Sequence, residues 1–192
     1  MPRPEKLDLL SDEHAKRAQS EQERFWNDLD NESDRGMVLS AGAYFEKLLE
    51  DCLSSYLTKS KESADLLGSS RELGSFSSRN KLCVALRILS QEEAQALRLL
   101  ANVRNVFAHE ILVTFDEASV GDRVREFAKC SLGAESSIWQ DVKEMDLRKM
   151  FSFSLFILSD RLWLRPYDVH LHTDSYPELI PFHMDTITGD TE

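Results

Sequence analysis

The chain has few residues that interrupt helices and no apolar run long enough to cross a membrane. Only 7 Gly and 5 Pro occur among 192 residues. This scarcity argues against a many-turned sandwich or barrel and favours long helices. The longest apolar stretch, residues 151–158, contains two serines and is too short to span a bilayer. No apolar segment follows the charged N-terminus, so no secretory signal peptide is expected.

Cysteine is also scarce, and its spacing matches no known framework. Cys52, Cys83 and Cys130 are far apart and odd in number. Disulfide scaffolds and zinc knuckles need closely spaced or paired cysteines. The three residues are therefore predicted to be reduced thiols in a cytoplasmic protein.

Basic residues are outnumbered by acidic ones at both ends of the chain. Residues 1–34 carry ten acids and five bases, and residues 166–192 carry six acids and no Lys or Arg. Residues 35–165 have eighteen of each, so the net charge of −11 belongs to the ends. Binding to nucleic acid requires cations that neutralise phosphates. Autonomous high-affinity DNA binding is therefore disfavoured.

What the sequence does contain is helical periodicity. Apolar residues recur at spacings of three and four, which is typical of helices with one buried face. The predicted fold is all-α, an antiparallel bundle of about five or six helices. The predicted organisation is an acidic N-terminal helix over residues 1–30, a helical domain over 31–165 and an acidic tail over 166–192. Helices are expected at 7–29, 34–58, 75–89, 91–109, from 116 or 119 to 130, and 137–164.

Three of these helices have local sequence features that bear on where they begin or how they pack. The sequence from Ser90 to Glu93 is a capping box that opens helix 91–109. Gly36 and Gly42 lower helix propensity within 34–58, which indicates close approach by another helix. Helix 137–164 is apolar on most sides, so we expect a central position and an apolar face that drives self-association.

The strongest candidate site lies at the end of helix 91–109. Arg104 projects from the expected apolar stripe of that helix, and Asn105 and His109 lie on the adjoining polar flank. A guanidinium in an apolar stripe must be paired or must line a cleft. One interpretation is a structural ion pair with Glu46 or Glu50 of helix 34–58. The other is a functional site in which arginine holds a phosphate and histidine moves a proton.

The order of three stretches resembles the mannitol operon repressor family, a set of small all-helical bacterial proteins. The stretches are DRGMVLSAGAYFEKLL at residues 34–49, LGSFSSR at 73–79 and LRLL through RNVFAH at 97–109, with Phe115-Asp116 close behind. The resemblance covers roughly residues 30–162. It implies a role in transcriptional regulation. Because no recognition helix with a basic face is visible, such a role is expected to operate through a protein partner.

The Arg-Asn-x-x-x-His element alone is similar to the motif of the wider HEPN group. Some members of that group are metal-independent ribonucleases, and many are inactive interaction domains. The similarity places Arg104 and His109 at a cleavage site with Asn105 beside them, usually between two facing subunits. An enzyme needs an accessible His109 in a cleft with Arg104 turned toward it. A regulator leaves Arg104 tied to a carboxylate.

The sequence favours a non-enzymatic, self-associating regulatory protein that acts through protein–protein contacts. An RNA endonuclease using Arg104, Asn105 and His109 is the alternative, and a purely structural interaction module is a third. No cofactor, metal or membrane partner is expected. A cluster of His and acidic residues in the tail is interpreted as chance, because metal sites need fixed geometry and supporting contacts. Its members are His170, His172, His183, Asp168 and Asp174.

Overall fold

The computed structural model describes residues 12–68, 70–134, 136–166 and 168–169, and these contain eight α-helices and no strand. The expected all-α helical bundle is confirmed. For residues 12–19 and 21 the structure describes the backbone and not the side chains. The helices are α1 (Asp12–Asp30), α2 (Asp34–Tyr56), α3 (Lys61–Leu67), α4 (Phe76–Ala85), α5 (Gln91–His109), α6 (Ala118–Leu132), α7 (Ser137–Val142) and α8 (Leu147–Leu162).

The count of helices differs from the expected five or six because two short helices were missed. The segment between α2 and α4 contains α3, which begins where the Ser60 hydroxyl accepts a hydrogen bond from the Ser63 backbone N–H at 3.1 Å. The expected helix 137–164 is divided into α7 and α8. Helix α7 ends at Val142, and after a short turn Asp146 caps α8 by accepting a hydrogen bond from the Lys149 N–H at 3.0 Å.

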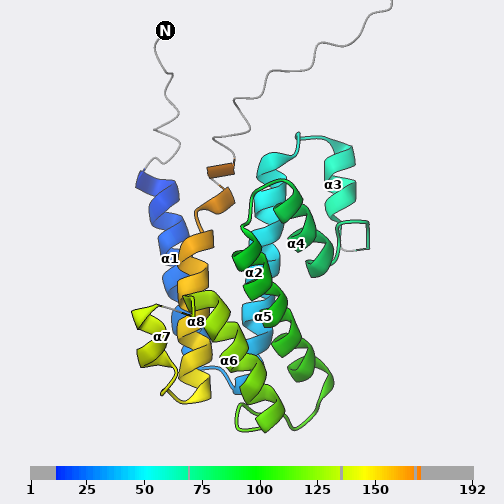
Figure 1. The fold of residues 1–192 in the computed structure, drawn as a ribbon. Coiled ribbons are helices and arrows are strands. Elements are labelled where there is room, and N and C mark those ends of the chain that lie inside the picture. The colour runs from blue at the N-terminus through cyan, green and yellow to red at the C-terminus, as the bar shows by residue number, and fades with distance from the viewer. Residues whose placement is uncertain (1–11, 69, 135, 167, 170–192) are drawn as a thin grey trace, which may run out of the picture.

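The helices pack around one apolar core. Figure 1 shows α8 beside α1 and α6, with α5 next to α2 and α4. Four aromatic rings contact one another in the core. The distances between ring centroids are 5.2 Å for Phe107 and Phe115, 5.3 Å for Phe115 and Phe151, and 5.5 Å for Phe127 and Phe151. These rings come from α5, the α5–α6 loop, α8 and α6, so one cluster fixes four segments against one another.

Helix α1 covers part of the remaining apolar surface of α2 and α8. The Phe25 ring stacks on Tyr44 of α2 with centroids 4.4 Å apart, and the Trp26 ring meets Phe156 of α8 edge to face at 5.6 Å. Leu29 is buried. The Tyr44 hydroxyl also forms a hydrogen bond with the Ser159 hydroxyl at 3.1 Å. The apolar positions of the acidic N-terminal helix therefore face the domain body. No helix among the described residues is long and apolar enough to cross a membrane.

The three cysteines are free thiols, and two of them are buried. Burial raises the pKa of Cys52 and of Cys83 to about 12, and it also raises the pKa of Cys130. We expect a thiol reagent at about pH 8 to modify Cys130 first and the other two only after unfolding, because the thiolate is the reactive species.

The same shift in pKa predicts lower stability in alkali. The thiols of the unfolded chain have a pKa near 9.0, whereas the folded ones remain protonated until about pH 12. The unfolded state therefore binds fewer protons across this range, and the free energy of unfolding must fall as pH rises through it. Urea titrations of the parent and of Cys83→Ala, run at several alkaline pH values, measure this. An equally steep loss in both proteins would contradict the assignment to the thiols.

Candidate functional site

Helix α5 carries the sequence-predicted motif, and its bounds agree with the expected 91–109. The Ser90 hydroxyl accepts a hydrogen bond from the Glu93 N–H at 3.1 Å, and the Glu93 carboxylate accepts one from the Ser90 N–H at 2.8 Å. This capping box confirms the predicted start. The helix ends at His109. Its buried residues are Ala94, Ala96, Leu97, Leu99, Leu100, Val103 and Phe107.

Arg104 lies among the positions of this apolar stripe, but its side chain is not buried. The stripe passes through Val103 and Phe107, whereas Ala108 is exposed. At about 100° per residue, Arg104 lies about 40° around the helix from the buried Leu100 and about 60° from the buried Phe107. Its side chain is 38% exposed, and its Nη2 lies 4.0 Å from Glu46 Oε2. Arg104 therefore makes a loose, half-exposed contact with α2.

At Gly42 of α2, the group that approaches closely is the Arg104 side chain. A Cβ added to Gly42 would lie 2.9 Å from Arg104 Cδ and 3.1 Å from Arg104 Cγ. The aliphatic part of the arginine therefore crosses directly over the α2 backbone. This path carries the guanidinium toward Glu46 of α2 and not toward the end of α5, where His109 lies.

Asn105 and His109 are both exposed on the outside of α5. In the described part of the chain, neither side chain takes part in a hydrogen bond or an ion pair. The side chains of Asn105 and His109 therefore face outward, whereas that of Arg104 lies against α2. The arginine contacts a carboxylate, and the histidine faces solvent.

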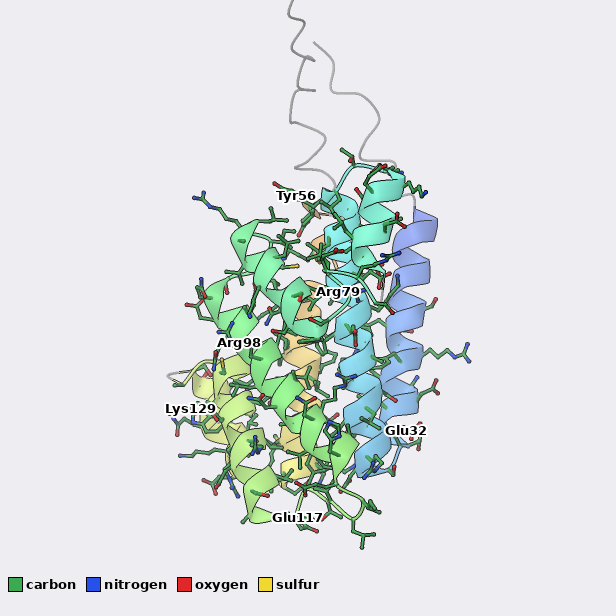
Figure 2. The ribbon with its side chains drawn as sticks, turned by 90° about the vertical axis from the view of Figure 1, so that its right-hand side faces the viewer. Glu32, Tyr56, Arg79, Arg98, Glu117 and Lys129 are labelled. Atoms are coloured by element: carbon green, nitrogen blue, oxygen red, sulfur yellow. The ribbon has the colours of Figure 1, made fainter. Side chains whose placement is uncertain are left out.

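The buried arginine of this protein is Arg79 of α4, which sequence reasoning missed. Its side chain is only 4% exposed, and Figure 2 labels it among α2, α4 and the neighbouring loop. Its Nη2 lies 3.1 Å from Glu50 Oε2, and its Nη1 lies 3.9 Å from Glu46 Oε1. It also donates hydrogen bonds at 2.8 Å to the carbonyl oxygens of Leu67 and Leu73. The signal was present, because Arg79 follows the buried Phe76 by three positions on the same face of α4.

Glu46 links the two arginines into one chain of charges. Arg104 and Arg79 both approach Glu46, and Arg79 continues to Glu50. Lys47 extends the chain, because its Nζ lies 3.5 Å from Glu50 Oε1 and 2.8 Å from Asp51 Oδ1. The chain therefore contains three cations and three carboxylates, and its formal charge is zero. It connects α5, α2 and α4 and holds the loop before α4. Such a neutral, internally paired cluster stabilises packing and offers a phosphate little uncompensated positive charge.

A second candidate site is a groove of about 940 Å³ between α1 and α8. We call it the α1–α8 groove. Its apolar lining is Trp26, Met37, Met145, Phe153 and Phe156, and its polar lining is Glu23, Asn27, Asp30, Asp146, Arg148, Lys149 and Ser152. The Trp26 indole Nε1 is buried and has no hydrogen-bond partner among the described residues. A concave apolar surface with a polar rim is typical of a binding site.

Two arginines fix the end of the molecule next to this groove. Arg148 Nη1 lies 2.6 Å from Asp34 Oδ1, and Asp34 Oδ2 accepts a hydrogen bond from the Phe115 N–H at 3.3 Å. Arg35 donates hydrogen bonds to the carbonyl oxygens of Glu110 and Ile111. The α1–α2 junction and the α5–α6 loop therefore meet at one end, where Figure 2 labels Glu32 and Glu117.

The histidine cluster of the C-terminal tail lies outside the described residues, except for Asp168. Within the described ranges, no group of three or more His, Cys, Asp or Glu residues is placed to hold a metal ion.

The described residues form an all-helical domain with a charge-paired cluster and an apolar groove. Among solved structures, the chain is similar to one in the MtlR–HPr complex from Escherichia coli, in which MtlR is a mannitol operon regulator. The TM-score is 0.56 and the identity 18%, over 73% of this chain and 99% of that chain. At this identity the likeness shows the fold alone. No family model matches the chain. No curated protein matches it either.

Proposed function

We propose that this protein is a non-enzymatic regulator that acts on transcription by binding another protein and not by binding DNA itself. The observation that carries the proposal is its shared fold with a regulator whose structure was solved with a protein partner, HPr. The balanced charge of residues 35–165 and the acidic ends support it, because neither provides a cationic face for a duplex. Residues 31–165 are the proposed regulatory domain, with residues 1–30 and 166–192 as acidic additions.

The proposal predicts opposite results for two titrations of the purified protein. Calorimetric titration with HPr from the native host should give a dissociation constant of about 10 μM or lower, typical of a specific transient complex. Fluorescence anisotropy with operator-length duplex DNA at physiological salt should show no binding below about 1 μM. Sequence-selective DNA binding in that range without a partner would overturn the proposal. Absence of HPr binding would exclude HPr as the partner. If affinity capture from the host then found no other regulator, the proposal would be wrong.

The ribonuclease interpretation is tested by the same preparation. It draws on the exposure of Asn105 and His109, whereas the Arg104 guanidinium approaches Glu46 and not the histidine. We expect no metal-independent cleavage of single-stranded RNA by the parent. The opposite result would be cleavage by the parent that both Arg104→Ala and His109→Ala abolish while the circular dichroism stays unchanged. It would show that this surface is catalytic and not regulatory.

We also propose that the protein self-associates. Helix α8 presents Phe156 with 45% of its surface exposed, and the nearby Met145 is 38% exposed. Exposed apolar side chains gathered around a groove usually mark an interface. Ile138 and Leu164, also within residues 137–164, are exposed as well, so this segment leaves several apolar side chains uncovered.

A further inference from the structure

We propose that the loop between α5 and α6 is the surface that docks on a partner protein. Its Ile111 and Leu112 are the apolar anchors, and they enter an apolar pocket of that protein whose rim carries lysine or arginine. The inference rests on the proposed action through a protein partner and assigns it a surface. Three features of the loop carry it: the exposure of the two side chains, the order of the backbone beneath them, and the negative charge around them.

The two anchors are far more exposed than any other large hydrophobic side chain in the described part of the chain. Ile111 is 87% exposed and Leu112 is 88% exposed, whereas the next in order, Phe156, is 45% exposed. Neither anchor adds burial to the fold of this chain, so their apolar surface is available to another molecule. Adjacent exposed apolar side chains mark a contact site, unlike single ones that are scattered over a surface.

The register of the loop shows that a leucine at position 112 is not needed for folding. Exposed and buried residues alternate from 112 to 116, because Val113 and Phe115 are buried whereas Thr114 and Asp116 are exposed. Leu112 belongs to the exposed set, whose other two members are polar. A polar residue at 112 would leave the same side chains in the core. The leucine therefore serves a contact outside this chain.

The backbone of the loop is held on both sides of the anchors. Arg35 of α2 donates hydrogen bonds to the carbonyl oxygens of Glu110 and Ile111. Beyond the anchors, the Phe115 N–H donates a hydrogen bond to Asp34 Oδ2 at 3.3 Å, and the Phe115 ring belongs to the aromatic cluster of the core. An ordered backbone loses little conformational entropy on binding, so mainly the rotamers of the two anchors remain to be fixed.

The surroundings of the anchors are acidic. Loop residues 110–117 include three acidic residues and no Lys or Arg, and the loop contacts residues 30–35, which include three acidic residues and one Arg. Arg148 of α8 adds a second cation, which already contacts Asp34 Oδ1 and the Glu32 carbonyl oxygen at 2.6 Å each. These six carboxylates and two cations have a formal charge of −4. This charge complements a pocket with a cationic rim.

The same charge argues against the other classes of occupant. A second copy of this chain would bring two acidic ends face to face, and like charges oppose such a contact. Anionic lipid surfaces and nucleic acids repel an acidic loop for the same reason. A protein with a cationic rim is attracted instead, and the net charge of −11 of the whole chain adds to that attraction.

The decisive experiment is photo-crosslinking of the full chain in cells of the native host. p-Benzoylphenylalanine replaces Thr114, which is exposed beside the anchors and leaves both of them intact. Irradiation should give one major cross-linked protein, and mass spectrometry should place the cross-linked peptide next to lysine or arginine residues. The control carries the same group in place of Leu66 on α3, a residue that is 39% exposed and outside the loop, and should not give that product.

Two further substitutions test the anchors and the charge. In the chain labelled at 114, Leu112→Ser should lower the cross-link yield about tenfold, as loss of an anchor residue does, whereas the matched change Leu66→Ser should not. Titration of the cross-linked partner, once purified, should show about threefold weaker binding for Glu110→Gln and a smaller dependence on salt, because a rim charge acts on association. Glu72→Gln, at another exposed loop glutamate, is the control and should bind as the parent does.

Every other result contradicts the proposal. A cross-link from position 114 to this chain itself would make the loop a contact between copies, and so would a loss of self-association in Leu112→Ser by sedimentation velocity at roughly tens of micromolar. Products with lipid or nucleic acid alone, no product, or a yield that Leu112→Ser leaves unchanged would show that the loop is not a protein-docking surface.

Failure of this surface and failure of the proposed regulatory function give different results. A parent that binds HPr or another regulator without a cross-link from position 114 would overturn the docking surface alone. A cross-linked partner with no role in transcription would support the docking surface and contradict the regulatory function.

Discussion

Replacement of Arg79 by alanine will lower the free energy of unfolding by about 3–5 kcal/mol, the loss found when one partner of a buried ion pair is removed. The arginine is 4% exposed, and its removal leaves Glu50 with only the longer, 3.5 Å contact to the exposed Lys47. The carbonyl oxygens of Leu67 and Leu73 lose their guanidinium donors as well. Because these carbonyls belong to the end of α3 and the loop before α4, that segment should lose its attachment to the domain.

The matched control for this prediction is Arg104→Ala. Both arginines approach Glu46, but Arg104 is 38% exposed and its contact is 4.0 Å long. A half-exposed ion pair is screened by solvent and contributes about 1 kcal/mol or less. Urea denaturation of both variants beside the parent measures the difference. Equal losses would contradict the assignment of the structural role to Arg79. Arg79→Lys keeps the charge without the planar fork and should lie between the parent and the alanine variant.

Replacement of Phe151 by alanine will destabilise the protein by about 3–5 kcal/mol, as large-to-small changes of buried phenylalanines do. Phe151 is fully buried, and its ring contacts both Phe115 and Phe127. Its loss opens a cavity where α8, α6 and the α5–α6 loop meet. That loop carries Ile111 and Leu112, so its hydrogen exchange should increase along with the fall in stability.

Phe156→Ala provides the control, because it makes the same change in the same helix. The Phe156 side chain is 45% exposed and has one edge-to-face contact, with Trp26. Its loss should cost about 1 kcal/mol, the size of a single aromatic pair. Thermal and urea unfolding of the two variants at a concentration where the parent is monomeric gives the comparison. A loss for Phe151→Ala no greater than for Phe156→Ala would show that the ring cluster does not organise this end of the core.

The helices that the sequence predicted well are those with local start signals. The capping box at Ser90 and Glu93 defined α5 to the residue, and Ser33 caps α2 by accepting from the Gly36 N–H at 3.1 Å. Ser60 and Asp146 cap α3 and α8 in the same way, although the periodicity of apolar residues predicts neither the short α3 nor the break between α7 and α8. A capping interaction joins residues at most four positions apart, so it can be predicted from the sequence alone.

The sequence alone determined that the protein is all-α, where its periodic helices lie, and that its excess of acid belongs to its ends. Tertiary structure decided which arginine is buried and where apolar groups remain exposed. Arg79 and Arg104 each project near an apolar stripe, and only the packing of α4 on α2 buries the first. The ion pair between Arg148 and Asp34 joins residues 114 positions apart. Periodicity and capping depend on neighbours a few residues away, whereas pairing and exposure depend on which faces meet after folding.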